Sequence, residues 1–264
     1  MIVPDINIFL RHTFDGLGRR RCAHWSLTAI IALGALLRVV FLLRDPLPSR
    51  DGLFYLDLYN HWLRTDNDAV LNPMLYYMFY FADRCGIDPM AVAVGCNIFF
   101  SIILIWVGYL IGCTLWHRAS AGLIFALLLA VNYTLIRNSV EVQRESGYLL
   151  CWGLAFLGMA RGSMERFASE RKRLQWWMMA GIFAALAALF RYEAYEILPL
   201  CLAWLLIWRC FARWKWQTAG WCFLSFVCVW ILVIGMFCLT ETGIPVVKNG
   251  LLNRIIFYQK WIGF

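Results

Sequence analysis

Charged residues are scarce in this sequence: they make up 15% of its 264 residues, whereas 62% are hydrophobic. Soluble domains contain about a quarter charged residues, so this scarcity excludes an ordinary soluble protein and places the chain among membrane proteins. The net charge of +8 does not indicate nucleic-acid binding. The basic residues fall in clusters between apolar runs, which is the pattern of cytoplasmic loops in membrane proteins.

The sequence also lacks the signs of a metal-binding, secreted or modular protein. None of its ten cysteines forms a CxxC pair and most lie in apolar runs, so we expect neither a zinc site nor a disulfide framework. The first apolar run, after GRRRCAHW, has no small-residue cleavage pattern at its end, which indicates a retained helix. With no solenoid repeat, no low-complexity linker and little sequence after the last apolar run, we expect a single transmembrane domain over residues 1–264 and no attached soluble catalytic domain.

Long apolar runs are what the sequence has in abundance. A helix needs about 20 mostly apolar residues to cross a bilayer, so we predict an all-α polytopic membrane protein with about seven transmembrane helices. The run LNPMLYYMFYFADR (71–84) is too short to span and fits a helix lying in the interface, a depth that suits its tyrosines. The predicted spans are roughly Trp25–Leu43, Pro89–Cys113, Ala119–Ile136, Gly147–Ala160, Trp176–Phe190, Ala194–Cys210 and Gln217–Thr240.

Positive charge predicts the orientation of these spans. With the N-terminus inside, four basic clusters fall on the cytoplasmic side, as the positive-inside rule requires. Most acidic residues then fall outside, in a first external loop (about 44–88) that holds interfacial helices, in later short turns and in an external tail (about 241–264). The four basic clusters are Arg19–Arg21, His117–Arg118, Arg161–Arg173 and Arg209–Lys215.

The stretch SRDGLFYLDLYNHW (Ser49–Trp62) follows the first span and reads as a short amphipathic helix in the headgroup layer. Either Ser49 or Asp51 is positioned to cap it. From the spacing alone, Asp51 is either a helix cap or an acid held at the membrane surface for chemistry. Both alternatives stay open at this point.

Arg191 and Glu193 lie in a short turn between two apolar segments, LFRYEAYEILP. Charged residues so close to hydrocarbon are costly and are often functional. One interpretation is a snorkelling arginine paired with Glu193. The other is an arginine that holds a lipid phosphate, because a guanidinium matches phosphate geometry.

Other charged residues are weaker signals. Glu141 and Glu145, in the second external loop, share a face if that segment is helical, and a solvated loop is the alternative. Asp66 and Asp68 have a D-x-D spacing that is only weakly indicative of a divalent metal beside a diphosphate, so we assign no metal ligands and leave the cofactor unknown. Arg38, inside the first span, either snorkels outward or faces the interior of the bundle.

The order of these features resembles the GT-C superfamily of membrane glycosyltransferases, in particular its PMT/ArnT-like and RgtA-like branch, glycosyltransferase family 39. These enzymes take a sugar from a polyprenyl-phosphate carrier on the outer face of the membrane. The resemblance covers most of residues 25–240. It rests on four stretches in order: SRDGLFYLDLYNHW, NPMLYYMFYF, IRNSVEVQRESGYLL and AGIFAALAALFRYEAYEILPL.

The resemblance assigns roles to individual residues. Asp51 matches the family's catalytic acid, and Glu145 matches an acid that precedes an aromatic-led helix in the second loop. Arg191 and Glu193 match the Arg-Pro-Glu that ends a small-residue helix, with Tyr192 in place of the usual proline. The chain departs from the family in two ways. A glycine follows Asp51 where many members have a second acid, and the chain is short, as expected of a compact member, a fragment or a subunit.

The implied reaction is transfer of a sugar from a polyprenyl-phosphate donor to a hydroxyl of a lipid, glycan or protein acceptor. Asp51 is expected to act as general base. Arg191 is expected to bind the lipid phosphate and stabilise it as the leaving group. Tyr55 and Tyr59, on the Asp51 face of the same helix, are expected to flank the sugar. The complete set of candidate substrate-binding residues is Tyr55, Tyr59, Glu141, Glu145 and Glu193.

Two other functions remain as alternatives: a transporter or flippase of a lipid-linked substrate, and a truncated non-catalytic membrane subunit. A transporter is less favoured because the spans show no inverted repeat and no Pro/Gly-broken pair in matching halves. The acids also gather at one face instead of the bilayer midplane. The expected location is the cell inner membrane, as a multi-pass protein in contact with membrane lipid, with its active site on the periplasmic or external side and no nucleic-acid partner.

Overall fold

A computed structural model describes residues 6–44, 50–65, 73–164, 169–211 and 215–238. Within these ranges the chain is almost entirely helical, with short turns between helices, and contains no strand. The elements are α1 (Ile6–Arg44), α2 (Arg50–Thr65), α3 (Pro73–Arg84), α4 (Pro89–Trp116), α5 (Ala119–Val131), α6 (Tyr133–Val140), α7 (Glu145–Met164), α8 (Glu170–Phe190), the 3-10 helix η1 (Tyr192–Glu196), α9 (Ile197–Phe211) and α10 (Trp216–Cys238).

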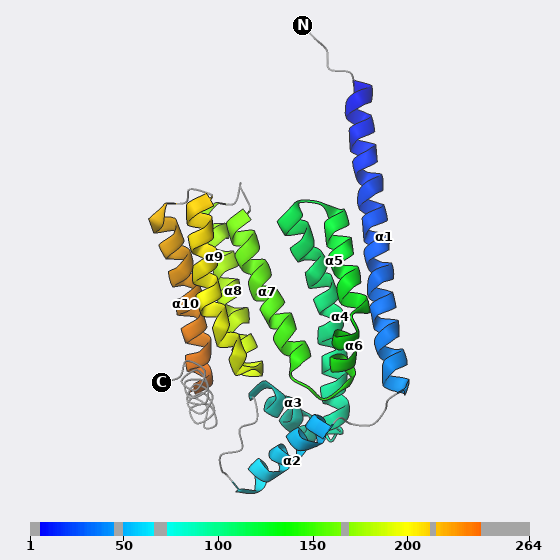
Figure 1. Cartoon of the computed structure of the whole chain (residues 1–264), viewed down its shortest axis with the longest axis vertical. Coiled ribbons are helices and arrows are strands. Elements are labelled where there is room, and N and C mark those ends of the chain that lie inside the picture. The colour runs from blue at the N-terminus through cyan, green and yellow to red at the C-terminus, as the bar shows by residue number, and fades with distance from the viewer. Residues whose placement is uncertain (1–5, 45–49, 66–72, 165–168, 212–214, 239–264) are drawn as a thin grey trace, which may run out of the picture.

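The long helices form one bundle with two short helices across one end. Figure 1 shows α1, α4, α5, α7, α8, α9 and α10 running along the bundle, while α2 and α3 lie below it. The most extensive packing joins α7 to α8, α4 to α5, α8 to α10 and α4 to α7. We call the end that carries α2 and α3 the α2–α3 end.

Apolar length confirms an all-α polytopic membrane protein. In the described part of the chain, four helices are long and apolar enough to cross a membrane, or five if the bent pair α5 and α6 is one span. The four are the Cys22–Arg44 part of α1, α4, α8 and the Trp216–Met236 part of α10. Helices α7 and α9 lie in the bundle without meeting these criteria, so the count of seven spans stays a prediction. The helix α3 has 12 residues, too few to span, as expected.

Two helix boundaries differ from those predicted. Helix α1 begins at Ile6, well before the apolar run at Trp25. The segment predicted as one span over Ala119–Ile136 is broken at Asn132, where α5 and α6 meet at a bend of 54°. The Asn132 side chain accepts a hydrogen bond of 3.0 Å from the backbone N–H of Leu135. Asparagine favours helix caps over helix interiors, which accounts for the break.

Arg38 faces the interior of the bundle, which settles the alternative left open by its position. Its side chain is fully buried. The Nε and Nη2 groups donate to Ser101 Oγ on α4 at 2.9 and 2.7 Å, and Nη1 donates to the Gly34 carbonyl at 2.8 Å. The guanidinium therefore links α1 to α4 through the bundle core.

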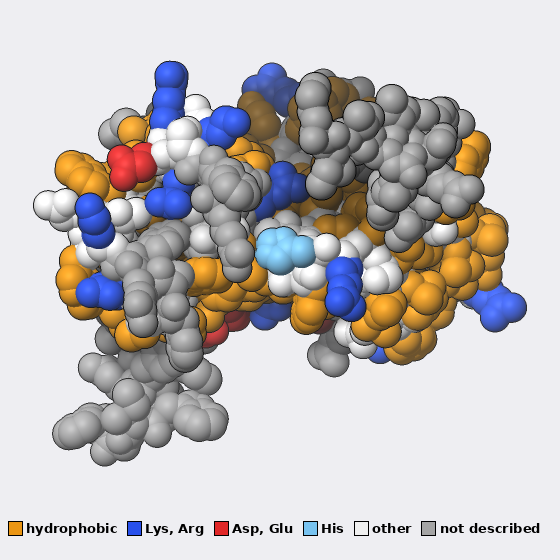
Figure 2. All heavy atoms as spheres, turned by 90° about the horizontal axis from the view of Figure 1, so that it is seen from above, with side chains coloured by type: hydrophobic (Ala, Val, Ile, Leu, Met, Phe, Trp, Pro, Cys, Tyr) orange, Lys and Arg blue, Asp and Glu red, His pale blue; other side chains and the backbone are white. Residues whose placement is uncertain are grey.

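Charge separates the two ends of the bundle. Helices α4, α7 and α9 end, and α5, α8 and α10 begin, at the end opposite α2 and α3 (Figure 1). Figure 2 views that end and shows many Lys and Arg side chains with little acid among the coloured atoms. We call it the basic end, defined by Arg118, Arg161, Arg171, Lys172, Arg173, Arg209 and Lys215. The described acids of the α2–α3 end are Asp51, Asp57, Asp83, Asp88, Glu141, Glu145, Glu193 and Glu196.

Candidate functional site

Helix α2 presents Asp51 at its start. Asp51 lies in the first helical turn and is exposed, in a position where its negative charge complements the helix N-terminus. Ser49, the other predicted cap, lies outside the described residues. One turn further on, Tyr55 is half-buried, while Asp57 on another face is exposed. The helix therefore holds an accessible carboxylate and a partly accessible phenol on one side.

Tyr59, predicted to flank a sugar, lies in the core instead. Only 1% of it is exposed, and it packs among Leu75, Phe79 and Val142. Its hydroxyl donates a 2.6 Å hydrogen bond to Asp83 on α3, and burial together with this bond raises the pKa of the phenol. Tyr59 joins α2 to α3, and it does not accompany Tyr55 on an open surface.

Three of the predicted residues come together where the start of α7 lies beside the end of α8. Arg191 Nη1 donates to Glu145 Oε1 at 2.9 Å, and Arg191 Nε donates to Glu193 Oε2 at 3.2 Å. The guanidinium also lies over the Tyr148 ring at 5.5 Å from its centre. We call Glu145, Tyr148, Arg191 and Glu193 the arginine cluster. Its two ion pairs show that Arg191 makes the local pair with Glu193 and also a long-range pair with Glu145.

Local structure explains why these charges meet. Glu145 begins α7, and Arg191 directly follows the last residue of α8, so an acid lies at a helix N-terminus and a base at a helix C-terminus. The tight 3-10 turn of η1 brings Glu193 back to Arg191. Burial alone would lower the pKa of Arg191, but the hydrogen bond that Arg191 donates to Glu193 and the charges of Glu193 and Glu145 outweigh it and raise that pKa.

Tyr55 of α2 is within electrostatic range of the arginine cluster. The pKa of its phenol is raised first by burial, then by the nearby charges of Glu145 and Asp51, against the opposite effects of Arg144 and Arg191. These four charged groups come from the start of α2, the start of α7 and the end of α8, so the charges of three elements act on one tyrosine. The candidate site is therefore formed by Asp51, Tyr55, Arg144, Glu145, Tyr148, Arg191 and Glu193.

A glycine allows the close approach of α7 and α8 beside the arginine cluster. A Cβ atom at Gly147 would lie 2.3 Å from the Phe190 ring, closer than any side chain tolerates. Gly147 is two residues after Glu145, and Phe190 directly precedes Arg191. The missing side chain at Gly147 therefore sets the spacing at which Glu145 reaches Arg191.

Glu141 does not share a helix face with Glu145, so that alternative is wrong. Glu141 ends α6 in an extended conformation, and α7 begins only at Glu145. Its carboxylate pairs with Arg137 at 2.9 Å and accepts a hydrogen bond from Gln143. The buried Asn97 of α4 donates to the backbone carbonyls of Glu141 and Gln143 at 2.8 and 2.7 Å. Glu141 thus belongs to a loop fixed to α4 that leads into Glu145.

Sequence reasoning did not select Arg144, Tyr148 or Asn97. Arg144 was visible as the residue before Glu145, and Tyr148 as the aromatic one turn after it. Asn97 was visible as a lone amide inside an apolar span, a kind of residue that is seldom placed there without a partner.

No group of three or more His, Cys, Asp or Glu side chains that could hold a metal ion occurs among the residues that the structure describes. Asp66 and Asp68, the weak metal signal, lie outside those residues.

An apolar cavity of about 560 Å³ opens at the α2–α3 end of the bundle. It lies between the end of α1, α2, α4 and the α6–α7 segment, and Leu53, two residues after Asp51, is part of its wall. Asp88 is the charged residue of its lining. The other lining residues are Leu42, Met90, Ala91, Val94, Gly95, Ile98, Val140 and Val142.

The fold and the site define a polytopic helical membrane protein that carries a charged site and an apolar cavity at the same end of the bundle. A family model described as dolichyl-phosphate-mannose-protein mannosyltransferase matches residues 64–236, which is more than half of the chain. The chain belongs to this family, which is one of membrane glycosyltransferases of the GT-C type. A comparison with curated proteins gives no match.

The matched region includes part of the candidate site. It contains Arg144, the whole arginine cluster and the apolar helices from α4 to α10, but it begins after Asp51 and Tyr55. The family match therefore supports glycosyl transfer over the transporter alternative, while the role of Asp51 rests on its geometry and on the sequence resemblance.

Proposed function

We propose that this chain transfers a sugar from a polyprenyl-phosphate donor to an acceptor hydroxyl at the α2–α3 end of the bundle. The observation that carries the proposal is the pairing of Arg191 with Glu145 and Glu193, at a place where the charges of Arg144, Glu145, Arg191 and Asp51 all act on the half-buried Tyr55. Glycosyl transfer from a lipid phosphate needs a base for the acceptor, a cation for the leaving phosphate and a polar surface for the sugar. The candidate site contains residues suited to each task.

Asp51 is the proposed general base. It accepts the proton of the acceptor hydroxyl as that oxygen attacks the anomeric carbon, and the bond from this carbon to the phosphate oxygen breaks with its electron pair leaving on the phosphate. The carboxylate suits this role because it is exposed at the start of α2 and directly precedes a glycine. One base is sufficient for a single-displacement reaction.

Arg191 is the proposed phosphate ligand. A guanidinium has five N–H donors, and its two ion pairs use two of them. In this proposal Glu145 and Glu193 orient the Arg191 guanidinium. Arg144 adds a second positive charge that offsets part of the negative charge of the two glutamates. Stabilisation of the developing phosphate charge by fixed donors is commonly the largest electrostatic contribution to such a reaction.

Tyr55 is the proposed sugar contact. A phenol is protonated at neutral pH, so Tyr55 offers a hydrogen-bond donor to a sugar oxygen. The apolar cavity beside Leu53 is suited to the isoprenoid part of the donor, because its lining is mostly aliphatic. Tyr59 is not part of this proposal because it is buried.

We further propose that the α2–α3 end faces the periplasm or cell exterior, with the protein in the inner membrane. The support is the excess of Lys and Arg over acids at the basic end; at the α2–α3 end the acids lie among arginines such as Arg84, Arg137, Arg144 and Arg191. In a cysteine-free background, Asn60→Cys should react with an impermeant thiol reagent in intact cells, and Lys172→Cys should react only after lysis. Both positions are exposed in the structure. Labelling of Lys172→Cys in intact cells would show that the proposed orientation is wrong.

The test of catalysis uses purified full-length protein in vesicles of membrane lipid extract with radiolabelled polyprenyl-phosphate hexoses and pentoses. Release of polyprenyl phosphate and incorporation of label into lipid or protein are measured together. Asp51→Asn keeps the size and capping ability of the residue and should lower the rate about 10²–10⁴-fold.

Asp57→Asn is the matched control, since Asp57 is exposed on another face of the same helix. It should retain nearly the full rate. Equal losses in the two variants, or a rate within a few-fold of wild type for Asp51→Asn, would remove Asp51 as the base. Transfer from soluble sugar nucleotides in place of every lipid-linked donor would overturn the donor class.

A further inference from the structure

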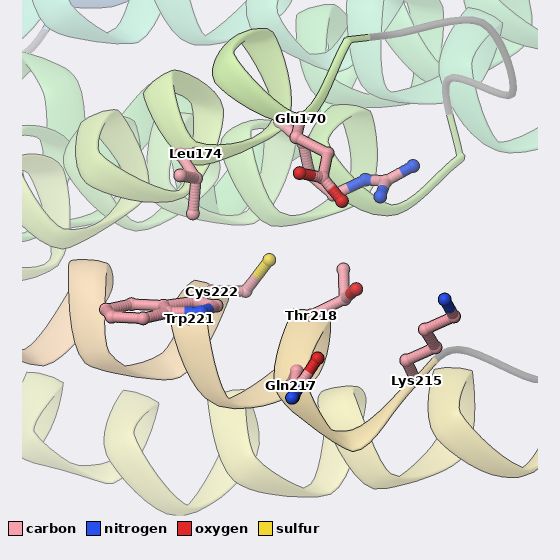
Figure 3. Close-up of a pocket in the computed structure, with 8 residues that line it drawn as sticks. Glu170, Leu174, Lys215, Gln217, Thr218, Trp221 and Cys222 are labelled. Carbon is pink, nitrogen blue, oxygen red and sulfur yellow. The ribbon is translucent and has the colours of Figure 1, made fainter.

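A second pocket lies at the basic end, far from the site proposed for sugar transfer. It has a volume of about 190 Å³ and lies between the start of α8 and the start of α10. Figure 3 shows Glu170 and Leu174 on one wall, facing Thr218 and Cys222 on the other. The 21 residues of α8, at a rise of 1.5 Å each, place this pocket about 30 Å from Arg191. The lining residues are Glu170, Arg173, Leu174, Lys215, Gln217, Thr218, Trp221 and Cys222.

One part of the pocket favours an anion. Arg173 and Lys215 supply two positive charges. The first turn of α10 contains no acidic residue, and its leading N–H groups have no partner within the helix. Such a helix start attracts an anion such as phosphate. Gln217 and Thr218, both in that turn, add side-chain hydrogen-bond donors.

Glu170 places a negative charge in the same pocket. Its charge and that of Arg173 both reach the Cys222 thiol, so the two groups act across one small space. A bare phosphate would gain from the cations and lose from Glu170. A ligand that carries an ammonium group next to its phosphate would gain from both.

The position of the pocket favours a lipid over a soluble ligand. Trp221 lines it and is 62% exposed, and Trp216 at the start of α10 is 66% exposed. Tryptophan is enriched where a membrane protein meets the lipid headgroups. The Arg209 guanidinium lies over the Trp216 ring at 4.9 Å from its centre. Further along α10, Leu224, Ile231 and Leu232 are exposed apolar residues suited to acyl chains.

The size of the pocket agrees with a headgroup. Its volume equals that of about six water molecules, which admits a phosphate with a short polar substituent and excludes the acyl chains. The geometry points to a binding site for the phosphoethanolamine headgroup of a membrane phospholipid at the basic end. Arg173, Lys215 and the start of α10 hold the phosphate, and Glu170 holds the ammonium.

The assignment is tested by native mass spectrometry of the delipidated full-length protein. The probes are phosphatidylethanolamine and phosphatidylglycerol with identical acyl chains, with inorganic phosphate as competitor. Wild type should bind one phosphatidylethanolamine about tenfold or more tightly than phosphatidylglycerol, which corresponds to one charge-assisted hydrogen bond. Inorganic phosphate in the millimolar range should not displace it.

Three variants separate the parts of the site. Glu170→Gln should abolish the preference for phosphatidylethanolamine and leave phosphatidylglycerol binding equal or tighter. Arg173→Gln and Lys215→Gln should each weaken both lipids. Lys172→Gln is the control, because Lys172 is exposed on α8 outside the pocket lining. Thermal unfolding of each variant identifies those that misfold. Lys215 directly precedes α10, so Lys215→Gln alters no residue inside a helix.

Several outcomes would overturn the assignment. Equal binding of the two lipids by wild type would remove the role of Glu170 as ammonium ligand. Reduced stability of Glu170→Gln with an unchanged lipid preference would leave Glu170 only its favourable place in the first turn of α8. Displacement by inorganic phosphate would identify a soluble anion as the ligand. None of these results depends on sugar transfer, so the two proposals fail separately.

Discussion

The buried link between Arg38 and Ser101 predicts an unusual order of mutant stabilities. Ser101→Ala removes the acceptor of two N–H groups, which lie at 2.9 and 2.7 Å from its oxygen, and leaves the guanidinium in place. Hydrogen bonds between membrane helices are worth about 0.6 kcal/mol on average and up to about 1.7. Two such bonds to a charged donor give an expected loss of about 1–3 kcal/mol.

Arg38→Met should cost less than Ser101→Ala, although it replaces the larger and more polar residue. It removes the two hydrogen bonds to Ser101 together with those from Nη1 to the Gly34 and Ala130 carbonyls. It also removes the burial of a charge, which insertion scales place at about 2.5–3.5 kcal/mol at a helix centre. Replacement of a buried charge by an apolar residue of similar length is often neutral or stabilising, and methionine fills irregular space well. We expect a change within about 1 kcal/mol of wild type.

The double variant Arg38→Met with Ser101→Ala should resemble Arg38→Met alone, with a coupling of about 1 kcal/mol or more. The assay is reversible unfolding in mixed micelles, followed by circular dichroism. Thr114→Ala is the control on α4, because its hydroxyl bonds only to the Leu110 carbonyl of the same helix among the described contacts, and it should change stability by less than about 0.5 kcal/mol. Additive losses, or a Ser101→Ala variant as stable as wild type, would refute the reasoning.

Three further predictions concern the candidate site. Arg191→Lys keeps the charge but loses the bidentate fork, so the KM for the lipid donor should rise; unchanged donor kinetics would contradict the phosphate role. Gly147→Ala forces the Phe190 ring to move and should cost about 1–3 kcal/mol with weaker donor use, whereas Gly153→Ala, whose Cβ would meet its nearest neighbour at 3.4 Å, should be tolerated in both assays. Tyr59→Phe should lose about 0.5–1.5 kcal/mol of stability and keep its turnover, and a large loss of turnover in a stable protein would restore Tyr59 as a substrate contact.

Much of the fold could be predicted because apolar length and charge clusters depend on composition alone. The short helix α3 and the position of each basic connection follow from such counts. The break at Asn132 does not, since one polar residue in an apolar run interrupts a helix only when its side chain finds a backbone N–H to bind. The direction of Arg38 was also unpredictable, because it depends on Ser101 of another helix.

The site was predictable where its contacts are local. Arg191 and Glu193 are two residues apart, so their pairing could be considered from the sequence. The pairing of Arg191 with Glu145 joins residues 46 positions apart and requires the close packing of Gly147 against Phe190. Tyr59 shows the opposite difficulty: it continues the helix face of Asp51 and Tyr55, yet that face passes from the site into the core within two turns.

Between Ala180 and Ala188, every buried residue of α8 is a glycine or an alanine. Its buried positions include Ala180, Gly181, Ala184, Ala187 and Ala188, and a Cβ at Gly181 would lie 2.5 Å from the Phe226 carbonyl oxygen of α10. At these buried positions, substitutions to larger residues should therefore be selected against. Exchanges among glycine, alanine and serine keep α8 close to its neighbours α7 and α10. A larger side chain would push these helices apart. Among homologues, α8 should vary freely at its exposed positions, such as Met178 and Met179, and change least where its side chains are smallest.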